Sequence, residues 1–175
     1  MSIHYFTCDT AFGWLAVAAS GEGLVAVSWP AETPAAAVVR LGLDAAVRKT
    51  EPGATWGDLA RRLVAYFAGE RVSFDREPID CRGVPAFRCR AWAAVQAIPW
   101  GTVRSYGQVA RELGAPRAAR AIGGAMAANP VPIIVPCHRV LGANGALTGF
   151  GPGLPMKARL LALEGIDPGG GRLAY

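Results

Sequence analysis

The sequence lacks several features that mark membrane and secreted proteins. Among its 175 residues no apolar run is long enough to span a membrane. The first ten residues contain no basic stretch followed by an apolar core, so we expect no secretion signal. The four cysteines, Cys8, Cys81, Cys89 and Cys137, form no Cys-x-x-Cys pair. This scatter favours reduced thiols over a disulfide framework, and we expect a soluble cytoplasmic protein.

Acidic residues are scarce in the second half of the chain. Residues 86–175 hold ten Lys/Arg but three Asp/Glu, whereas residues 1–85 hold eight Lys/Arg and ten Asp/Glu. A basic half joined to an acidic half favours a polyanionic partner for the basic half, and nucleic acid is the obvious candidate. The alternative is an ordinary arginine-rich surface, which charge alone does not exclude.

The first half of the chain is expected to form a small domain built on a β-meander. Short apolar runs at residues 3–8, 14–18 and 24–29 are separated by turn residues. Residues 34–49 are alanine-rich and are expected to be helical, and residues 72–79 are a candidate fourth strand. Leu59, Leu63 and Phe67 are spaced for an amphipathic helix over residues 58–68. We find no chemical motif here and expect structural support.

The second half is expected to be mostly helical. The Gly- and Pro-containing segment 80–85 looks like a linker, so we predict domains at residues 1–82 and 83–175. Apolar spacing predicts a helix from Phe87 to Ile98 and another from Tyr106 to Leu113 with Ser105 as its N-cap. A tight turn and a helix over residues 117–128 follow, which is the pattern of a helix-turn-helix. The fold class predicted is therefore α/β of the α+β type, with a winged helix-turn-helix-like C-terminal domain.

The helix over residues 117–128 has an unusual outer face. On a helical wheel Ile122 and Met126 lie on the core side, and the opposite side is occupied by small residues and two arginines, namely Arg117, Arg120, Ala121, Gly124 and Ala128. Small side chains would let the backbone approach DNA closely. The alternative is a helix packed between other elements, and base rates for such look-alikes favour it when the helix is taken alone.

One cysteine has chemically suggestive neighbours. Cys137 lies between Pro136 and His138, with Arg139 next, and cationic surroundings lower a thiol pKa. The alternative is an inert buried cysteine. A cysteine hydrolase dyad is disfavoured, because adjacent residues in an extended segment point to opposite sides.

These motifs together resemble the O6-alkylguanine-DNA alkyltransferases, also called methylated-DNA–protein-cysteine methyltransferases. Residues 136–140, Pro-Cys-His-Arg-Val, resemble the active-site signature of that family. Residues 98–110 resemble the first helix-turn-helix segment of the family, residues 117–126 its recognition helix, and residues 129–135 the approach to the cysteine. Gly145, residues 148–150 and 153–154, Lys157 and residues 160–165 continue the resemblance, which is good over 87–165 and weak before it.

The resemblance implies a role for each matching residue. Cys137 is the nucleophile, His138 activates it through a water, Glu164 orients His138, and Asn129 braces the active-site turn. Tyr106 assists base extrusion and leaving-group protonation, and Arg120 replaces the flipped nucleotide in the stack. The residues implied to bind DNA are Arg120, Tyr106, Gly107, Ala121 and Gly124. The residues implied to line the base pocket are Val140, Arg139, Pro132, Phe150 and Gly151.

The implied activity is single-turnover repair by a monomer without a cofactor. The partner is double-stranded DNA containing O6-alkylguanine, entered through the minor groove, with O4-alkylthymine as a possible second substrate. Some family members bind zinc in the N-terminal half; here His4 and Cys8 alone lie close together, so no metal is expected. The alternatives are a non-catalytic damage sensor, which would lack Cys137, and a plain helix-turn-helix regulator, which would not need Pro-Cys-His-Arg.

Overall fold

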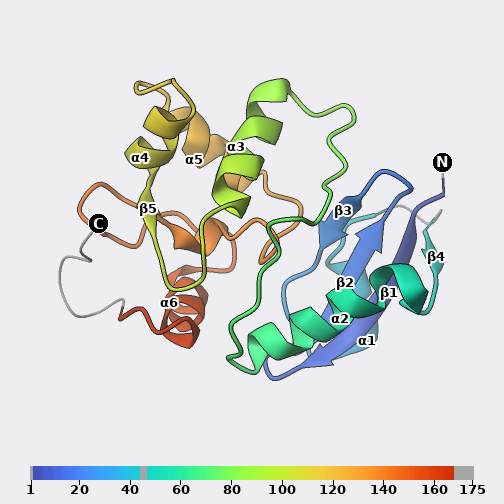
Figure 1. Cartoon of the computed structure of the whole chain (residues 1–175). Helices are drawn as coiled ribbons and strands as arrows, with labels where there is room; N and C mark the ends of the chain where they lie inside the picture. Colours follow the sequence, from blue (N-terminus) through green and yellow to red (C-terminus); the bar gives the residue numbers. More distant parts are fainter. Residues whose placement is uncertain (1, 44–46, 168–175) are drawn as a thin grey trace. The chain divides into compact units, whose positions relative to one another are not determined.

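The computed structural model describes residues 2–43 and 47–167, and these residues divide into two compact units. The first unit contains the described residues up to Asp80 together with Pro130–Pro132. The second contains Cys81–Asn129 and the described residues from Ile133 onward. The chain is an α+β protein with a sheet in the first unit and mainly helices in the second (Figure 1). Among the described residues no helix combines the length and apolar character needed to cross a bilayer.

The first unit is built on a four-stranded sheet of order β3-β2-β1-β4. The predicted meander is confirmed: β1 (His4–Thr10), β2 (Gly13–Ala19) and β3 (Leu24–Val27) pair antiparallel in sequence order. The β1–β2 turn needs glycine at Gly13, because its φ is +115° and a Cβ there would lie 2.6 Å from the Ala31 carbonyl oxygen. This short hairpin fixes the register of the sheet.

Helices cover both faces of this sheet (Figure 1). Successive β2 residues from Leu15 to Ala19 are all buried, although alternate residues point to opposite faces. Ala16 packs in a cluster with Ala37 of α1 (Pro34–Val39), and α2 (Gly53–Phe67) contacts β1. The predicted amphipathic helix is confirmed and begins five residues earlier than expected.

Two predictions for the first unit are wrong. The helix expected over residues 34–49 ends at Val39, and Arg48–Lys49 forms β4, which pairs parallel with β1. The alanine-rich composition favours a helix, but Gly42 adopts a φ of +65° and Arg48–Lys49 pair with the edge of the sheet, so the helix does not continue. Residues 44–46 lie outside the described residues. The strand expected over residues 72–79 is absent, and Ile79 alone forms a bridge, with Leu24.

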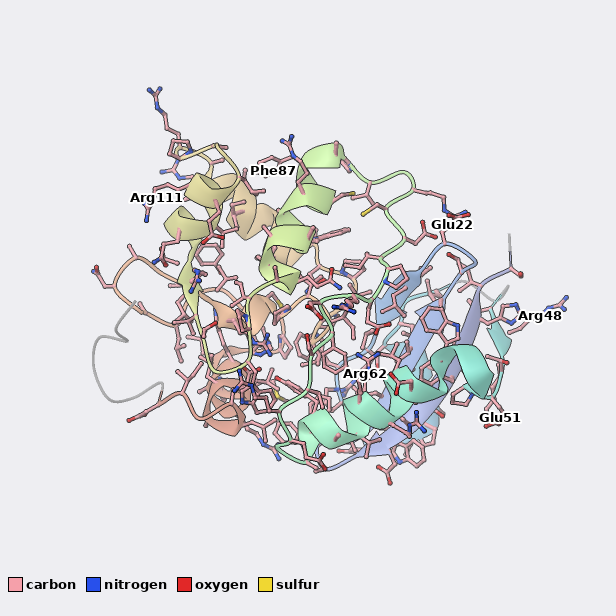
Figure 2. All side chains as sticks on the ribbon, viewed as in Figure 1. Glu22, Arg48, Glu51, Arg62, Phe87 and Arg111 are labelled. Atoms are coloured by element: carbon pink, nitrogen blue, oxygen red, sulfur yellow. The ribbon has the colours of Figure 1, made fainter. Side chains whose placement is uncertain are left out.

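Side-chain bonds hold the segment that replaces the expected strand. Arg62 projects from α2 (Figure 2) and donates to Asp58 at 2.7 Å, to the Ser73 carbonyl at 2.6 Å and to Glu77. The Ser73 hydroxyl bonds to Asp75 at 2.7 Å. Local polar contacts of this kind satisfy the segment without a β-ladder.

The second unit contains the predicted helix-turn-helix. Helices α3 (Ala86–Gln96), α4 (Tyr106–Glu112) and α5 (Ala119–Ala127) pack on one another (Figure 1). Ser105 caps α4 as predicted, in a capping box with Gln108. The Trp92 indole of α3 donates to the Ala125 carbonyl of α5 at 2.9 Å, which fixes the second helix of the motif.

Four elements complete the second unit around the cysteine. Cys137–Arg139 form the 3-10 turn η1, and β6 (Val140–Leu141) then pairs parallel with β5 (Arg104–Ser105). Helix α6 (Leu154–Leu163) contacts η1. The expectation that Cys137 and His138 lie in an extended segment is wrong, because the chain turns tightly here: Arg139 N–H bonds to the Pro136 carbonyl at 2.8 Å.

Candidate active site

Cys137 lies at the start of the η1 turn and is buried, with 7% of its surface exposed. The backbone N–H of Cys137 bonds to the Val135 carbonyl at 2.8 Å, and the Asn129 side-chain amide donates to the same carbonyl at 2.9 Å. The Asn129 side chain also hydrogen-bonds the thiol. The backbone before the turn is strained, since Ile133 has a φ of +72° in a β-branched residue. The structure therefore holds the thiol on a rigid turn.

A buried ion-pair cluster lies beside the cysteine in sequence. The His138 ring bonds through Nε2 to Glu164 Oε1 at 2.7 Å, and Arg139 donates to the same carboxylate through Nε at 2.8 Å and Nη2 at 2.9 Å. Arg139 Nη1 also donates to the Ile98 carbonyl. The structure thus brings His138 and Glu164, which are 26 residues apart, into direct contact.

Helix α6 places the Glu164 carboxylate. Glu164 is the C-cap residue of α6, and the chain after it forms a Schellman turn. Ile166 N–H bonds to the Leu161 carbonyl at 2.9 Å and Gly165 N–H to the Ala162 carbonyl at 3.0 Å. Gly165 adopts a φ of +78°, which suits glycine at this position. Gly101 N–H adds a bond of 3.3 Å to Glu164 Oε2.

The charge states of the cluster follow from its burial and bonds. Burial opposes ionisation of Glu164, but hydrogen bonds from His138 and Arg139 and the charge of Arg139 outweigh it, and the pKa of Glu164 falls to about 2. Burial lowers the pKa of His138, and it outweighs the opposing effect of Glu164. His138 is therefore neutral near pH 7, while the Glu164 carboxylate and the Arg139 guanidinium neutralise each other.

The expected activation of the thiol by cationic surroundings is wrong in its direction. Burial raises the pKa of the Cys137 thiol above its ordinary value, although Asn129 and the charge of Lys157 act in the opposite sense. The Arg139 guanidinium forms an ion pair with the Glu164 carboxylate. Cys137 is thus a protonated thiol at neutral pH, and its reaction requires removal of a proton.

Lys157 is a member of this site whose role the sequence analysis did not assign. Its side chain is fully buried in α6, and its Nζ donates to the Val140 carbonyl at 2.6 Å and the Thr148 carbonyl at 3.0 Å. The ammonium lies 5.7 Å from the centre of the Phe150 ring. A signal was present in the sequence, since the chain has two lysines and this one falls in the apolar helix that ends at Glu164.

The structure separates the other predicted site residues into two groups. Tyr106 is the first residue of α4, is half-buried, hydrogen-bonds Thr148, and is near enough to Cys137 for their charges to interact. Burial raises the pKa of Tyr106. The other group is solvent-facing on α5 and contains Arg120, Ala121 and Gly124. The two groups meet where a Cβ at Gly123 would lie 3.9 Å from the Tyr106 ring.

The predicted base pocket has a mixed outcome. Val140 is buried and Phe150 half-buried, and both contact Lys157; Gly151 is exposed. Pro132 is buried and belongs to the first unit. The Arg139 guanidinium donates hydrogen bonds to Glu164 and to the Ile98 carbonyl, and its assignment to the pocket stays a prediction. The structure describes no group of three or more His, Cys, Asp or Glu residues arranged for a metal.

Comparison with known proteins gives matches along nearly the whole chain. The family models for the ribonuclease-like domain and the DNA-binding domain of 6-O-methylguanine DNA methyltransferase match residues 3–81 and 86–166. A methylated-DNA–protein-cysteine methyltransferase of Mycobacterium tuberculosis is 45% identical over 93% of this chain and 92% of its own length. A relative with the same name from Mycolicibacterium paratuberculosis is 53% identical over 66% of this chain and 68% of its own length.

Solved structures agree. The crystal structure of Mycobacterium tuberculosis OGT in complex with DNA aligns with a TM-score of 0.74 at 43% identity, covering 92% of each chain. An archaeal O6-methylguanine-DNA methyltransferase from Pyrococcus kodakaraensis has the same fold at 23% identity, with a TM-score of 0.68 over 94% of this chain and 99% of its own. The resemblance drawn from the sequence is confirmed. With both domain models matched and Cys137 in its signature turn, the chain belongs to the 6-O-methylguanine DNA methyltransferase family.

Proposed function

We propose that this chain repairs alkylated DNA by moving the alkyl group of an O6-alkylguanine to its own Cys137. The observation that carries the proposal is the rigid turn that places Cys137 next to the buried His138–Glu164–Arg139 cluster. In the reaction a sulfur–carbon bond forms and the carbon–O6 bond breaks, and its electron pair goes to O6. The thiol proton ends on the departing guanine. A thiolate suits attack at a saturated carbon because it is polarisable.

The proton leaves Cys137 by way of His138. His138 is neutral, and its Nε2 is held by Glu164 at 2.7 Å, so Nδ1 is the ring atom left to take a proton through a water molecule. Glu164 fixes the ring and stabilises the imidazolium that forms. Arg139 keeps Glu164 ionised and in place. Asn129 braces the turn from the side of Val135.

Tyr106 is the residue proposed to donate a proton to the departing guanine. Its position at the first turn of α4 and its interaction with Cys137 put the phenol close to the reacting thiol. Burial raises its pKa, so the hydroxyl keeps its proton and can donate to the guanine as negative charge develops. Val140, Phe150 and Gly151, with Arg139, form the proposed surroundings of the base.

DNA enters by the exposed face of α5. Ala121 and Gly124 present almost no side chain, and a Cβ at Gly124 would meet no atom within 4 Å. Such a face lets the helix backbone press into the minor groove while Arg120 fills the space of the extruded nucleotide and Gly107 contacts the backbone. Base extrusion is physically required, because the alkylated oxygen lies inside the stack. O4-alkylthymine presents the same chemistry as a second substrate.

The remaining parts of the proposal concern organisation. Residues 1–82 serve as a structural domain and residues 83–175 carry DNA binding and catalysis, in a monomer that acts in the cytoplasm without a cofactor. Cys137 disfavours a non-catalytic damage sensor, and a gene regulator with a plain helix-turn-helix would not need the buried cluster behind the turn. Family membership also disfavours a cysteine hydrolase.

The test is intact-mass measurement after incubation with duplex DNA containing one O6-methylguanine. We expect one added methyl group per chain, with peptide mapping placing it on Cys137, and no further turnover when DNA is in excess. The thioether product has no neighbouring group able to cleave it, which is why transfer stops at one. Repeated turnover, or methylation at Cys8, Cys81 or Cys89, would exclude the proposed reaction.

A further inference from the structure

Two cysteines outside the reactive turn lie close together at the start of the second unit. Cys81 is the first residue of that unit, and Cys89 lies at the end of the first turn of α3, two residues after Phe87, which Figure 2 labels. Both are partly exposed thiols, whereas Cys8 and Cys137 are buried. The proposed reaction uses neither of the two partly exposed thiols.

The Cys89 sulfur lies against the turn that begins at Cys81. Its Sγ is 3.9 Å from the Cys81 carbonyl oxygen and 3.9 Å from the Val84 carbonyl oxygen. A Cα atom lies about 2.4 Å from the carbonyl oxygen of its own residue, so the Cα of Cys81 is within about 6.3 Å of the Cys89 sulfur. A disulfide needs Cα atoms roughly 4.4–6.8 Å apart. The two cysteines are therefore within reach of one another.

The turn between the two cysteines is able to adjust. Val84 N–H bonds to the Cys81 carbonyl at 3.1 Å, and Gly83 at the tip of the turn has a φ of +72°. Arg82 and Gly83 are exposed, and a Cβ at Gly83 would meet no atom within 4 Å. A turn whose tip is exposed to solvent can shift without disturbing a core, and such a shift brings the two sulfurs to bonding distance.

The chain around the two cysteines is cationic. Arg82 follows Cys81, Arg88 and Arg90 flank Cys89, and all three arginines are exposed. Residues 81–96 contain no Asp or Glu. Positive charge on a surface raises the local concentration of an anionic reagent. An anionic disulfide is therefore the oxidant that suits this pair of thiols.

We propose that Cys81 and Cys89 form a reversible disulfide site that reacts with an anionic low-molecular-weight disulfide. The Cys89 thiolate attacks one sulfur of the reagent, a mixed disulfide forms, and one reagent thiolate leaves. The Cys81 thiolate then attacks the Cys89 sulfur, the protein disulfide forms, and the second reagent thiolate leaves. Two electrons pass from the protein to the reagent, and the two cysteine protons end on the two released thiolates.

The disulfide ties the first residue of the second unit to the helix-turn-helix. Helix α3 contacts both α4 and α5, so a bond to its first turn restrains the segment that enters this group of helices (Figure 1). The site goes beyond the proposed function and does not use Cys137. It stands whether or not Cys137 accepts an alkyl group.

The first experiment maps the disulfide in the wild-type protein. The protein is incubated with excess oxidised glutathione, the remaining thiols are blocked with N-ethylmaleimide in denaturant, and the chain is digested with trypsin. Cleavage after arginine leaves Cys81 on residues 77–82 and Cys89 on residues 89–90. We expect these two peptides to be joined and to separate on reduction. The two buried cysteines should carry maleimide, because the exposed pair reacts about tenfold faster or more.

Three results of this mapping would overturn the proposal. The first is a mixed disulfide that persists on Cys81 or Cys89 with no link between them. The second is no reaction at either cysteine, and the third is oxidation of Cys8 or Cys137 ahead of the pair. Cys137→Ala is the matched control and should form the same link at the wild-type rate. A slower link in that variant would contradict the independence of the two sites.

The second experiment tests each cysteine separately. Cys81→Ser should keep one glutathione on Cys89, and Cys89→Ser should keep one on Cys81, because the thiol that would release it is missing. Cys8→Ser is the control and should form the wild-type link. A single-cysteine variant that joins its remaining thiol to Cys8 or Cys137 would overturn the pairing. If a variant does not fold, the mapping of the wild-type protein decides the question.

The third experiment tests the preference for an anionic reagent. The double variant Arg88→Gln, Arg90→Gln should react about threefold more slowly, or slower still, with oxidised glutathione at low salt. With cystamine, a cationic disulfide, the same variant should react as fast as wild type or faster. Arg61→Gln removes an exposed charge of the first unit and should match wild type with both reagents. Equal slowing with both reagents would overturn the anionic preference.

Discussion

Two cysteines, one in each unit, are buried to nearly the same degree and have different surroundings. Cys8 is 9% exposed in strand β1, opposite Leu15, and Cys137 is 7% exposed on the η1 turn. Burial, with a smaller effect of Asp9, raises the pKa of Cys8 to about 11. Burial also raises the pKa of Cys137, but there the Asn129 side chain, the charge of Lys157 and backbone hydrogen bonds at Cys137 and His138 oppose it. Burial is therefore common to the two thiols, and what separates them is the set of polar groups around Cys137.

The same contrast applies to the ion pairs of the two units. Asp58 pairs with Arg61 and Arg62 on the exposed side of α2, where water screens the charges. Glu164 pairs with His138 and Arg139 with no exposed side-chain surface of its own. A carboxylate held in that way keeps its charge and geometry through a reaction, whereas an exposed pair contributes little to either.

The largest expected effect comes from exchanging the two cysteines for alanine. Cys137→Ala should abolish alkyl transfer completely, because no other thiol is positioned on the reactive turn. Cys8→Ala should still accept one alkyl group per chain, since Cys8 packs within the sheet of the first unit. Intact mass after reaction with duplex DNA measures both. Loss of stoichiometric transfer in a folded Cys8→Ala protein would contradict the distinction between the two thiols.

The next largest effect concerns the unit formed by His138 and Glu164. His138→Ala and Glu164→Gln should each slow transfer about 10²-fold or more, because general acid–base steps commonly contribute that much. The double variant should be little slower than the poorer single variant, since the residues act together. Single-turnover rates test this, with Glu112→Gln as the matched control at the exposed Arg104–Glu112 pair. Multiplying losses would mean that the two residues act separately.

The smallest effect is expected at the exposed face of α5. Arg120→Ala should slow repair of duplex DNA by about 10- to 100-fold, because unstacking a base costs a few kcal/mol, while transfer from free O6-benzylguanine stays near the wild-type rate. Arg61→Ala, an exposed arginine of the first unit, serves as the control. Rates on the two substrates measure the difference. Equal losses on both would assign Arg120 a structural role and remove it from base extrusion.

Local features of the fold were predictable because they depend on residues close in sequence. The capping box of Ser105 and Gln108, the apolar spacing of α2 and α3, and the bare outer face of α5 follow from i, i+3 and i+4 patterns. The β-meander followed from alternating runs and turn residues. Predictions failed where a sheet edge or a loop contact overrode propensity, as for Arg48–Lys49 and residues 72–79.

The sequence by itself determined the family, and its contiguous signature at residues 136–140 indicated Cys137 as the candidate nucleophile. Tertiary structure alone decided the charges. It shows that Arg139 pairs with Glu164, and that burial raises the thiol pKa where neighbouring cations suggested a fall. It also shows that Lys157 is a buried cation, which bonds the Val140 carbonyl 17 residues away. The reason is physical: a pKa depends on burial and on groups brought together by the fold, and neither can be read from spacing along the chain.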